Sequence, residues 1–334
     1  MIVRAIDVGY GNTKFCYGKQ ENGVIRCGHF PSVATQLLKS EIGAGVMAKR
    51  DTVEVPSSDG MLYIVGVDAI DTLSGQDDAG RILGSDYINT PQHLAFFRGA
   101  LHYLDEPDID LLVTGLPVDY FSGYKDRMAA TLKGLHVFPD DRTVNVKEVW
   151  VVPQPVGGFI DYTMSAKRFA ELVDSKCLII DMGWFTVDFL VCCGLKLEDN
   201  RCGSTAGGMS QILKSLAALV SQDIHQKFDN INQLDKGIRN GFQMRLYGKP
   251  YDFSHLMPKV SSQIQTTLRV VLNSVGSLQD IDLIVLVGGG AECFRPEIDK
   301  LFDPVERVVA TEGIYANTRG FYRAGEERVK KYGR

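Results

Sequence analysis

The chain has 334 residues, and its 36 Lys and Arg against 41 Asp and Glu give a formal net charge of −5. Hydrophobic residues make up 45% of it, as in ordinary globular proteins, and no apolar run reaches the roughly 18 residues that span a bilayer. The charged start MIVRAID lacks the apolar stretch of a signal peptide, and the negative charge argues against a general nucleic-acid binder. The seven cysteines include no CxxC pair, which favours reduced thiols in a cytoplasmic protein. We expect two domains, since single cores stop growing at roughly 250–300 residues.

The first predicted element is a β-hairpin. Residues 2–6 and residues 14–17 are short apolar runs joined by a glycine-bearing connection, a pattern typical of two antiparallel strands. Residues 31–88 are richer in Gly, Ser and Asp, and we expect them to form a small inserted subdomain with a strand pair near Val53 and residues 62–65.

The remaining elements alternate between helices and strands. Apolar residues at helical spacing predict helices at residues 91–104, 165–173, 209–228 and 260–272. Continuous runs of Val, Ile and Leu, typical of strands covered on both faces, predict strands at residues 111–114, 149–152, 177–180, 186–193 and 281–287. This alternation implies an α/β fold.

A buried strand that ends in an Asp-x-Gly turn occurs twice. The two turns begin at Asp7 and Asp181, 174 residues apart in a chain of 334, and each is followed by another strand-like run. Because this spacing is close to half of the chain, we expect a duplicated fold.

The first turn, Asp7-Val-Gly-Tyr-Gly-Asn-Thr-Lys14, has the residue types of a phosphate loop. Glycines let backbone N–H groups approach phosphate oxygens, and Lys14 would add a positive charge beside them. Asp7 at the strand end can hold Mg²⁺ through water, because this ion keeps much of its hydration shell. The alternative is a plain β-turn with a solvated Asp and Lys, since such turns are common.

Two further motifs extend this pattern. Asp181-Met-Gly-Trp-Phe-Thr-Val-Asp188 repeats the strand, Asp-x-Gly, strand order, and two such hairpins could clamp a polyphosphate from opposite sides. The strand at 284–287 ends in Gly288, Gly289 and Gly290, where a flat adenine ring could approach closely. The alternative for these glycines is a tight strand-to-helix turn.

As an ordered set, these motifs resemble the ATPase superfamily of actin, heat-shock chaperones and sugar kinases, and within it the actin-like plasmid-segregation proteins of the ParM/StbA type. Residues 7–14 resemble the first phosphate loop, 152–158 the first connecting element, 181–188 the second phosphate loop, 287–291 the adenosine loop, and 317–321 (Asn-Thr-Arg-Gly-Phe) the second connecting element. The resemblance implies an actin-like, ribonuclease H-like duplicated α/β fold with two lobes around a nucleotide cleft.

The resemblance also implies a role for individual residues. Asp7 and Asp181 would organise Mg²⁺ through water, and Gln154 would position the attacking water; these three are the expected catalytic residues. Contacts with ATP or GTP are implied for Gly9, Tyr10, Gly11, Asn12, Thr13, Lys14, Gly183, Trp184, Phe185, Thr186, Gly207, Gly208, Lys236, Arg239, Gly288, Gly289 and Gly290. Positioning and charge neutralisation are the main tasks of a protein that catalyses phosphoryl transfer.

The implied lobes share the chain discontinuously. The first would comprise residues 1–160, with the 31–88 insertion, and the returning segment 314–334. The second would comprise residues 161–313, with a subdomain at 206–275.

Two departures from the family pattern concern the phosphate loops. Tyr10 stands where relatives have a small Ser or Thr, and Trp184 and Phe185 follow the second Asp-x-Gly. These bulky side chains would either narrow the site for the terminal phosphate or face the core between the loops.

The end of the chain is basic. Residues 319–334 hold six basic and two acidic side chains. Such a tail can contact acidic partners or DNA, or it can be the solvated face of a terminal helix.

The function implied by the resemblance is a cytoplasmic, filament-forming ATPase that segregates plasmid DNA. Copies would self-associate, an adaptor protein bound at a centromere-like DNA site would link the filament to DNA, and neither membrane contact nor direct sequence-specific DNA binding is expected. The alternatives are a small-molecule kinase of the same superfamily, with Asp161 as the nearest acid to the first connecting element, and a nucleotide switch that does not polymerise.

Overall fold

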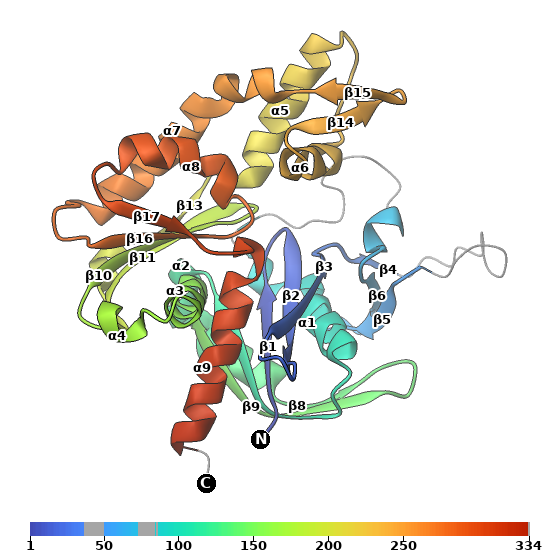
Figure 1. Cartoon of the computed structure of the whole chain (residues 1–334). Helices are drawn as coiled ribbons and strands as arrows, with labels where there is room; N and C mark the ends of the chain where they lie inside the picture. Colours follow the sequence, from blue (N-terminus) through green and yellow to red (C-terminus); the bar gives the residue numbers. More distant parts are fainter. Residues whose placement is uncertain (37–49, 73–83, 85, 333–334) are drawn as a thin grey trace. The chain divides into compact units, whose positions relative to one another are not determined.

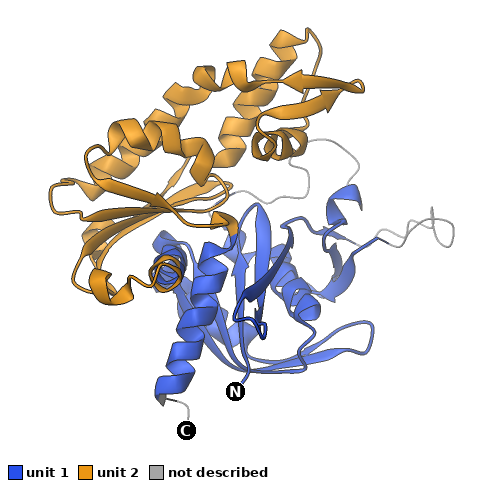
Figure 2. Cartoon of the chain, viewed as in Figure 1, with its two compact units in different colours: residues 1–74, 80–161, 315–334 blue, residues 75–79, 162–314 orange. Residues whose placement is uncertain are grey.

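The computed structural model describes residues 1–36, 50–72, 84 and 86–332. These residues form two compact units (Figure 2). Unit 1 comprises Met1–Ser74, Gly80–Asp161 and Tyr315–Arg334, and unit 2 comprises Gly75–Ala79 and Tyr162–Ile314.

Unit 1 is built on a sheet of six strands in the order β3-β2-β1-β7-β9-β8 (Figure 1). Its strands are β1 (Val3–Val8), β2 (Asn12–Lys19), β3 (Ile25–Pro31), β7 (Asp108–Leu116), β8 (Gly134–Val137) and β9 (Thr143–Pro153). β1 pairs with β2 as the predicted antiparallel hairpin, and it pairs with β7 in parallel. The helices are α1 (Pro91–Leu104), α2 (Val118–Leu132), α3 (Gln154–Ser165), which continues into unit 2, and α9 (Ala316–Tyr332).

A small three-stranded sheet lies within the predicted insertion. It consists of β4 (Thr35–Gln36), β5 (Val53–Pro56) and β6 (Leu62–Val65), and the predicted strand pair is the antiparallel pair β5–β6. Short 3-10 turns follow at η1 (Ala69–Thr72) and η2 (Tyr87–Asn89). The η2 turn leads directly into α1.

Unit 2 repeats the strand order of unit 1. Its main path is β12-β11-β10-β16-β17, with β13 also paired to β11, and β10–β11 is antiparallel while β10–β16 and β16–β17 are parallel. The strands are β10 (Lys176–Met182), β11 (Thr186–Cys193), β12 (Lys196–Leu197), β13 (Gly203–Ala206), β16 (Leu283–Val287) and β17 (Glu306–Val309). The matching order in the two units confirms the predicted duplication.

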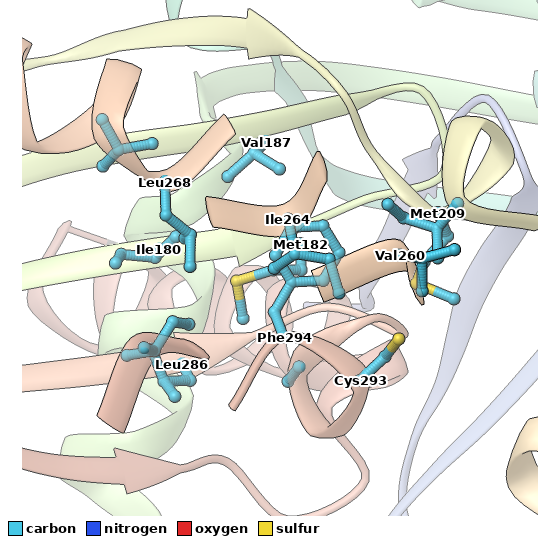
Figure 3. Packing of buried hydrophobic residues seen from close by; sticks show 14 of the residues in the cluster. Ile180, Met182, Val187, Met209, Val260, Ile264, Leu268, Leu286, Cys293 and Phe294 are labelled. Atoms are coloured by element: carbon cyan, nitrogen blue, oxygen red, sulfur yellow. The ribbon is translucent and has the colours of Figure 1, made fainter. Parts of the chain in front are cut away.

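The helices of unit 2 lie beside its sheet, and those within residues 209–301 contribute to a hydrophobic core with it. They are α4 (Phe169–Leu172), α5 (Met209–Asp223), α6 (Ile231–Arg239), α7 (Met257–Val275) and α8 (Ala291–Leu301), with 3-10 turns η3 (Asp199–Arg201), η4 (Ser254–Leu256) and η5 (Gly313–Tyr315) and a hairpin of β14 (Gln243–Leu246) and β15 (Lys249–Asp252). Buried side chains of the sheet, such as Ile180 and Leu286, pack with Met209, Ile264 and Phe294 of the helices (Figure 3).

Two helix predictions need correction. Residues 165–173 do not form one helix: α3 ends at Ser165 and only Phe169–Leu172 is helical again. Lys167 between them has φ 58°, a left-handed conformation that a helix cannot contain. The helix predicted over 209–228 ends at Asp223, and His225 with φ 52° lies just beyond that end.

Helices α3 and α9 cross at a contact between glycines. A Cβ at Gly320 would lie 1.8 Å from the carbonyl oxygen of Gly157, and a Cβ at Gly157 would lie 2.5 Å from the carbonyl oxygen of Asn317. Asn317 adds a side-chain hydrogen bond to the backbone N–H of Gly158 at 3.0 Å. This crossing holds the first residue of α3, Gln154, in place beside the central strands of unit 1.

Candidate functional site

The first glycine turn (residues 9–12) joins β1 to β2 at the end of a buried strand. Asp7 lies opposite Lys14 and Val8 opposite Thr13 in the antiparallel register, and the N–H of Gly9 donates to the carbonyl oxygen of Asn12 at 3.2 Å. Because directly opposite residues share a face of the sheet, the register brings the Asp7 and Lys14 side chains together.

The Asp7 carboxylate is the centre of the candidate site in unit 1. It is 1% exposed; its Oδ2 accepts from Lys14 Nζ at 2.9 Å and its Oδ1 accepts from Gln154 Nε2 at 2.8 Å. Gly115 of β7 lets the glutamine approach, since a Cβ there would lie 2.8 Å from Gln154 Cγ. Gln154, 147 positions from Asp7 in sequence, therefore joins Asp7 and Lys14 in one hydrogen-bonded group.

Tyr10 packs inside unit 1. Its ring is buried and stacks on Tyr87, with ring centroids 4.4 Å apart and planes at 23°, and its hydroxyl donates to the carbonyl oxygen of Gly84 at 3.2 Å. Of the two orientations considered for this bulky residue, the structure shows the one toward the core.

The second glycine turn (residues 183–186) joins β10 to β11 and binds the start of α5. The N–H of Gly183 donates to the carbonyl oxygen of Thr186 at 3.0 Å. The N–H groups of Gly208, Met209 and Ser210 donate to the carbonyl oxygens of Phe185, Gly183 and Trp184 at 3.0, 3.1 and 2.8 Å. These bonds satisfy N–H groups at a helix start that have no partner within the helix.

This capping also orients the second glycine turn. In a planar trans peptide the C=O and N–H point in opposite directions. The carbonyls of Gly183, Trp184 and Phe185 point toward α5, so the N–H groups of the next residue in each case point away from the helix. Successive N–H groups that share a direction form an anion-attracting surface, which is what a phosphate loop requires.

Glycines are required where α5 begins. A Cβ at Gly208 would lie 2.7 Å from the carbonyl oxygens of both Gly183 and Trp184, and Gly207, with φ 116°, would place a Cβ 2.2 Å from Thr267 Oγ1. Trp184 itself packs against the hydrophobic core of unit 2, so this bulky residue is accommodated at least in part by the core.

Asp188 belongs to the same site, although the sequence motif assigned it no role. It lies directly opposite Asp181 in the register of β10 and β11, and both carboxylates are buried, at 4% and 8% exposure. Its oxygens accept from Thr186 Oγ1 at 2.7 Å and from Ser204 Oγ. Its position as the last residue of the Asp-x-Gly motif is the sequence signal that could have identified it.

The three glycines that follow β16 have different roles. A Cβ at Gly288, where φ is 88°, would lie 2.4 Å from Asp181 Oδ1, and one at Gly290 would lie 2.8 Å from Met209 Cγ. Close packing thus requires a glycine at positions 288 and 290. This agrees with the alternative interpretation of these residues as a tight turn from strand to helix. Gly289 is exposed, and a Cβ there would meet no described atom within 4 Å. Its bare backbone is accessible to a ligand.

Lys236 and Arg239 lie on α6, in the part of unit 2 where α6 packs on α5. Arg239 forms an ion pair with Asp235. Burial and the charge of Asp235 raise the pKa of Cys293, in the first turn of α8, to about 12. Asp235 therefore lies near the helix that follows the three glycines, while no described contact joins Lys236 or Arg239 to the glycine turns.

The basic end of the chain is largely paired within unit 1. On α9, Arg319 and Arg323 bind the buried Asp161 at 2.8 and 3.2 Å. Arg328 binds Glu148 at 2.6 Å, and its guanidinium carbon lies 4.9 Å from the centre of the Trp150 ring. These contacts are those of a terminal helix on its own domain.

Three further findings bear on the predictions. All seven cysteines are free thiols, as expected. Among the described residues, no helix is both long and apolar enough to cross a membrane, and no group of three or more His, Cys, Asp or Glu side chains in that part of the chain could hold a metal ion.

Comparison with known proteins identifies the fold. An archaeal actin homologue, Ta0583, in complex with ADP has 18% sequence identity to the chain and a TM-score of 0.74, with 98% of this chain and 100% of that chain covered. The apo pSK41 ParM protein has 20% identity and a TM-score of 0.69, with 98% of each chain covered. A 15-stranded ParM filament from Clostridium botulinum has 20% identity and a TM-score of 0.75, with 98% of this chain and 100% of that chain covered.

No curated protein sequence matches the chain. Two family models match it in succession, one in each half. Residues 5–157 match the N-terminal domain of actin-like proteins, and residues 179–300 match the C-terminal domain of the archaeal MreB-like actin homologue. The chain therefore has an actin-like fold, with an N-terminal domain of the actin-like type and a C-terminal domain of the archaeal MreB-like type.

Proposed function

We propose that this protein binds ATP or GTP together with Mg²⁺, hydrolyses the nucleotide, and assembles into filaments of its own copies in the cytoplasm. The observation that carries the proposal is the pair of glycine turns, each beside a buried aspartate and each held in a fixed orientation by hydrogen bonds. The actin-like fold supports the same function, because the family that shares it includes nucleotide-binding filament proteins.

Each unit by itself offers groups of the kind that bind a nucleotide. In unit 1, Lys14 is a positive charge beside the first glycine turn. In unit 2, the second glycine turn offers N–H groups and Gly289 offers an open backbone. The archaeal relative in complex with ADP supports this part of the proposal. The remaining contacts predicted from the family, including those of Lys236 and Arg239, are retained as part of it.

Mg²⁺ would be held through water by Asp7 and Asp181. Both carboxylates are buried at the end of a strand, and Mg²⁺ usually takes one or two carboxylates together with phosphate oxygens and water. When bound, the ion would neutralise negative charge on the phosphates.

Gln154 is the residue that we assign to the attacking water. Its amide nitrogen is fixed on Asp7 at 2.8 Å, so its amide oxygen is held in a defined direction and can accept a hydrogen bond from water. Orienting a nucleophile in this way contributes through position rather than through proton transfer.

Segregation of plasmid DNA is the cellular role that we propose, on the basis of the ParM relatives. An adaptor protein at a centromere-like site would connect the filament to DNA. The ion pairs of Arg319, Arg323 and Arg328 within unit 1 support an indirect link, since these side chains are already paired with carboxylates.

One contact argues against the small-molecule kinase. A sugar kinase needs a carboxylate near the substrate hydroxyl, and Asp161 is the acid nearest to the first connecting element. Asp161 is 2% exposed and is bound by two arginines, so it stabilises the contact between α3 and α9 instead of facing a substrate.

Sedimentation tests the proposal directly. We expect the protein to pellet with Mg²⁺ and ATP or GTP, to pellet more persistently with a slowly hydrolysed analogue, and to stay in the supernatant with EDTA. Asp181→Asn should abolish phosphate release, because it removes a carboxylate at the phosphates, whereas Asp299→Asn on the outer end of α8 should not. Monomers under every nucleotide condition would overturn the filament claim, and phosphate passing to a small acceptor would indicate a kinase.

A further inference from the structure

The carbonyl group of Gly9, in the first glycine turn, is held by two hydroxyl groups from outside the hairpin. Ser32 Oγ donates to it at 2.6 Å and Tyr87 Oη donates to it at 3.1 Å. Ser32 is 1% exposed and Tyr87 is 3% exposed. Both hydroxyls are therefore largely shielded from water, which would otherwise compete for the carbonyl.

Tyr87 also holds the next residue of the turn. Its ring stacks on the ring of Tyr10. The Tyr87 side chain therefore contacts both the carbonyl oxygen of Gly9 and the side chain of Tyr10. Because a trans peptide is planar, a fixed Gly9 carbonyl fixes the Tyr10 N–H in the opposite direction, away from the two hydroxyls.

Tyr87 is itself held in place by contacts with Thr90 and His93. Its carbonyl oxygen accepts from the Thr90 hydroxyl at 2.7 Å and from the Thr90 N–H at 3.1 Å. Thr90 caps the start of α1 by accepting from the His93 N–H at 3.3 Å, and the His93 ring meets the Tyr87 ring edge-on at 5.0 Å. The tyrosine thus connects the first glycine turn to a 14-residue helix.

We infer that Tyr87 is a positioning residue for nucleotide binding: it sets the direction of the Tyr10 backbone N–H in the first glycine turn through the Gly9 carbonyl and the Tyr10 ring. The inference rests on the proposed function of that turn. The Tyr10 side chain stacks on Tyr87, and its hydroxyl binds Gly84. The hydroxyl groups that bind the Gly9 carbonyl are those of Ser32 and Tyr87.

The test compares four variants by calorimetric titration with a slowly hydrolysed triphosphate analogue and Mg²⁺. Tyr87→Phe removes the bond to Gly9 but keeps the ring stack, Ser32→Ala removes the other hydroxyl, and the third variant combines them. Tyr63→Phe is the matched control, because it removes a buried tyrosine hydroxyl bond of 2.6 Å, to Asp59, outside the site.

We expect Tyr87→Phe to weaken binding by about two- to tenfold, the range that one neutral hydrogen bond supplies. The double variant should weaken binding by more than the product of the two single factors, because a carbonyl that keeps one partner stays oriented and a carbonyl that loses both does not. Tyr63→Phe should bind like the wild type. In steady-state hydrolysis, Tyr87→Phe should raise KM and leave kcat nearly unchanged, since the lost contact serves ground state and transition state alike.

The possible outcomes separate this inference from the proposed function. A wild-type protein that binds no nucleotide would contradict the proposed function. A wild type that binds, together with a Tyr87→Phe variant of equal affinity and KM, would overturn the inference alone. Equal losses of affinity in Tyr87→Phe and Tyr63→Phe would also overturn it, because they would reflect a general loss of stability.

Discussion

Gly289 is a position where contact with a ligand can be tested separately from packing within the protein. Its neighbours Gly288 and Gly290 are required by contacts with Asp181 and Met209, whereas a Cβ at Gly289 would meet no described atom within 4 Å. A substitution at this position therefore tests ligand contact with little disturbance of the fold.

Gly289→Ala should leave the free energy of unfolding within about 0.5 kcal/mol of the wild type, the usual range for an exposed site. If the nucleotide base lies on this backbone, affinity should fall by about tenfold, equivalent to about 1.4 kcal/mol. Urea denaturation and nucleotide titration measure the two quantities, and Gly123→Ala on α2 is the control for the nucleotide affinity. Unchanged affinity would remove Gly289 from the proposed site.

The buried side chain of His93 makes the stability of unit 1 depend on pH. The side chain is 6% exposed, and burial lowers its pKa to about 3, against about 6.5 in an unfolded chain. Between these values the unfolded chain binds a proton that the folded chain excludes, so stability rises with pH across this window. His93 therefore costs the protein no stability above about pH 6.5. As the pH falls from 6.5 toward 3, the free energy of unfolding decreases, because the unfolded chain gains a proton on this residue.

His93→Phe should therefore flatten the stability curve below pH 6.5. The slope for one proton is about 1.4 kcal/mol per pH unit at most. Urea titrations of both proteins at several pH values between 4 and 7.5, taken as a difference, remove the shared effect of the carboxylates. Parallel curves would show that folding does not lower the pKa of His93.

At the residue scale, the sequence predicted the hairpin contact of Asp7 with Lys14 better than the contacts that hold the first glycine turn in place. The Asp-x-Gly repeat and the hairpin pattern placed Asp7 and Lys14 correctly, because cross-strand neighbours follow from a short turn. The hydroxyls on Gly9 come from residues 23 and 78 positions away. No local pattern specifies such contacts, since they depend on how the η2 turn packs against the hairpin.

Among the elements, the crossing of α3 and α9 is the most sensitive to a single methyl group. Gly320→Ala would place a Cβ 1.8 Å from the Gly157 carbonyl oxygen, so the helices would have to separate. We expect a loss of about 3 kcal/mol or more, the upper range for overpacking. Thermal and urea denaturation measure it.

The matched control is Gly123→Ala in α2, where a Cβ meets no described atom within 4 Å. There the same substitution should stabilise the protein by about 0.5–1 kcal/mol, because alanine is the better helix former. A similar effect of the two substitutions would show that the helices do not cross at Gly320.

Element boundaries were predicted well where a local signal marks them. Pro91 marks the start of α1, and the helix predicted at 91–104 is confirmed to the residue. The helix α3 was not predicted, because Gly157 and Gly158 resemble a loop in sequence, although the crossing with α9 requires Gly157. The ends of α3 and α5 were also misplaced, and the chain takes positive φ values just beyond them, at Lys167 and His225.

At the scale of the whole molecule, two sequence motifs were enough to predict the duplication, because each half of the chain begins its sheet with the same kind of hairpin. The two hairpins nevertheless differ in charge. Asp7 lies opposite Lys14 in unit 1, whereas Asp181 lies opposite Asp188 in unit 2. A repeat in sequence therefore predicts the topology of both halves but not the electrostatics of each.

The capping of α5 by the second glycine turn has a mechanical consequence within unit 2. Three hydrogen bonds fasten the turn to the helix, and 15 residues make a rod of about 22 Å. At the far end, Asp223 accepts from the Tyr251 hydroxyl of β15 at 2.7 Å. A displacement of the turn by an ångström would therefore be carried along this rod to the β14–β15 hairpin.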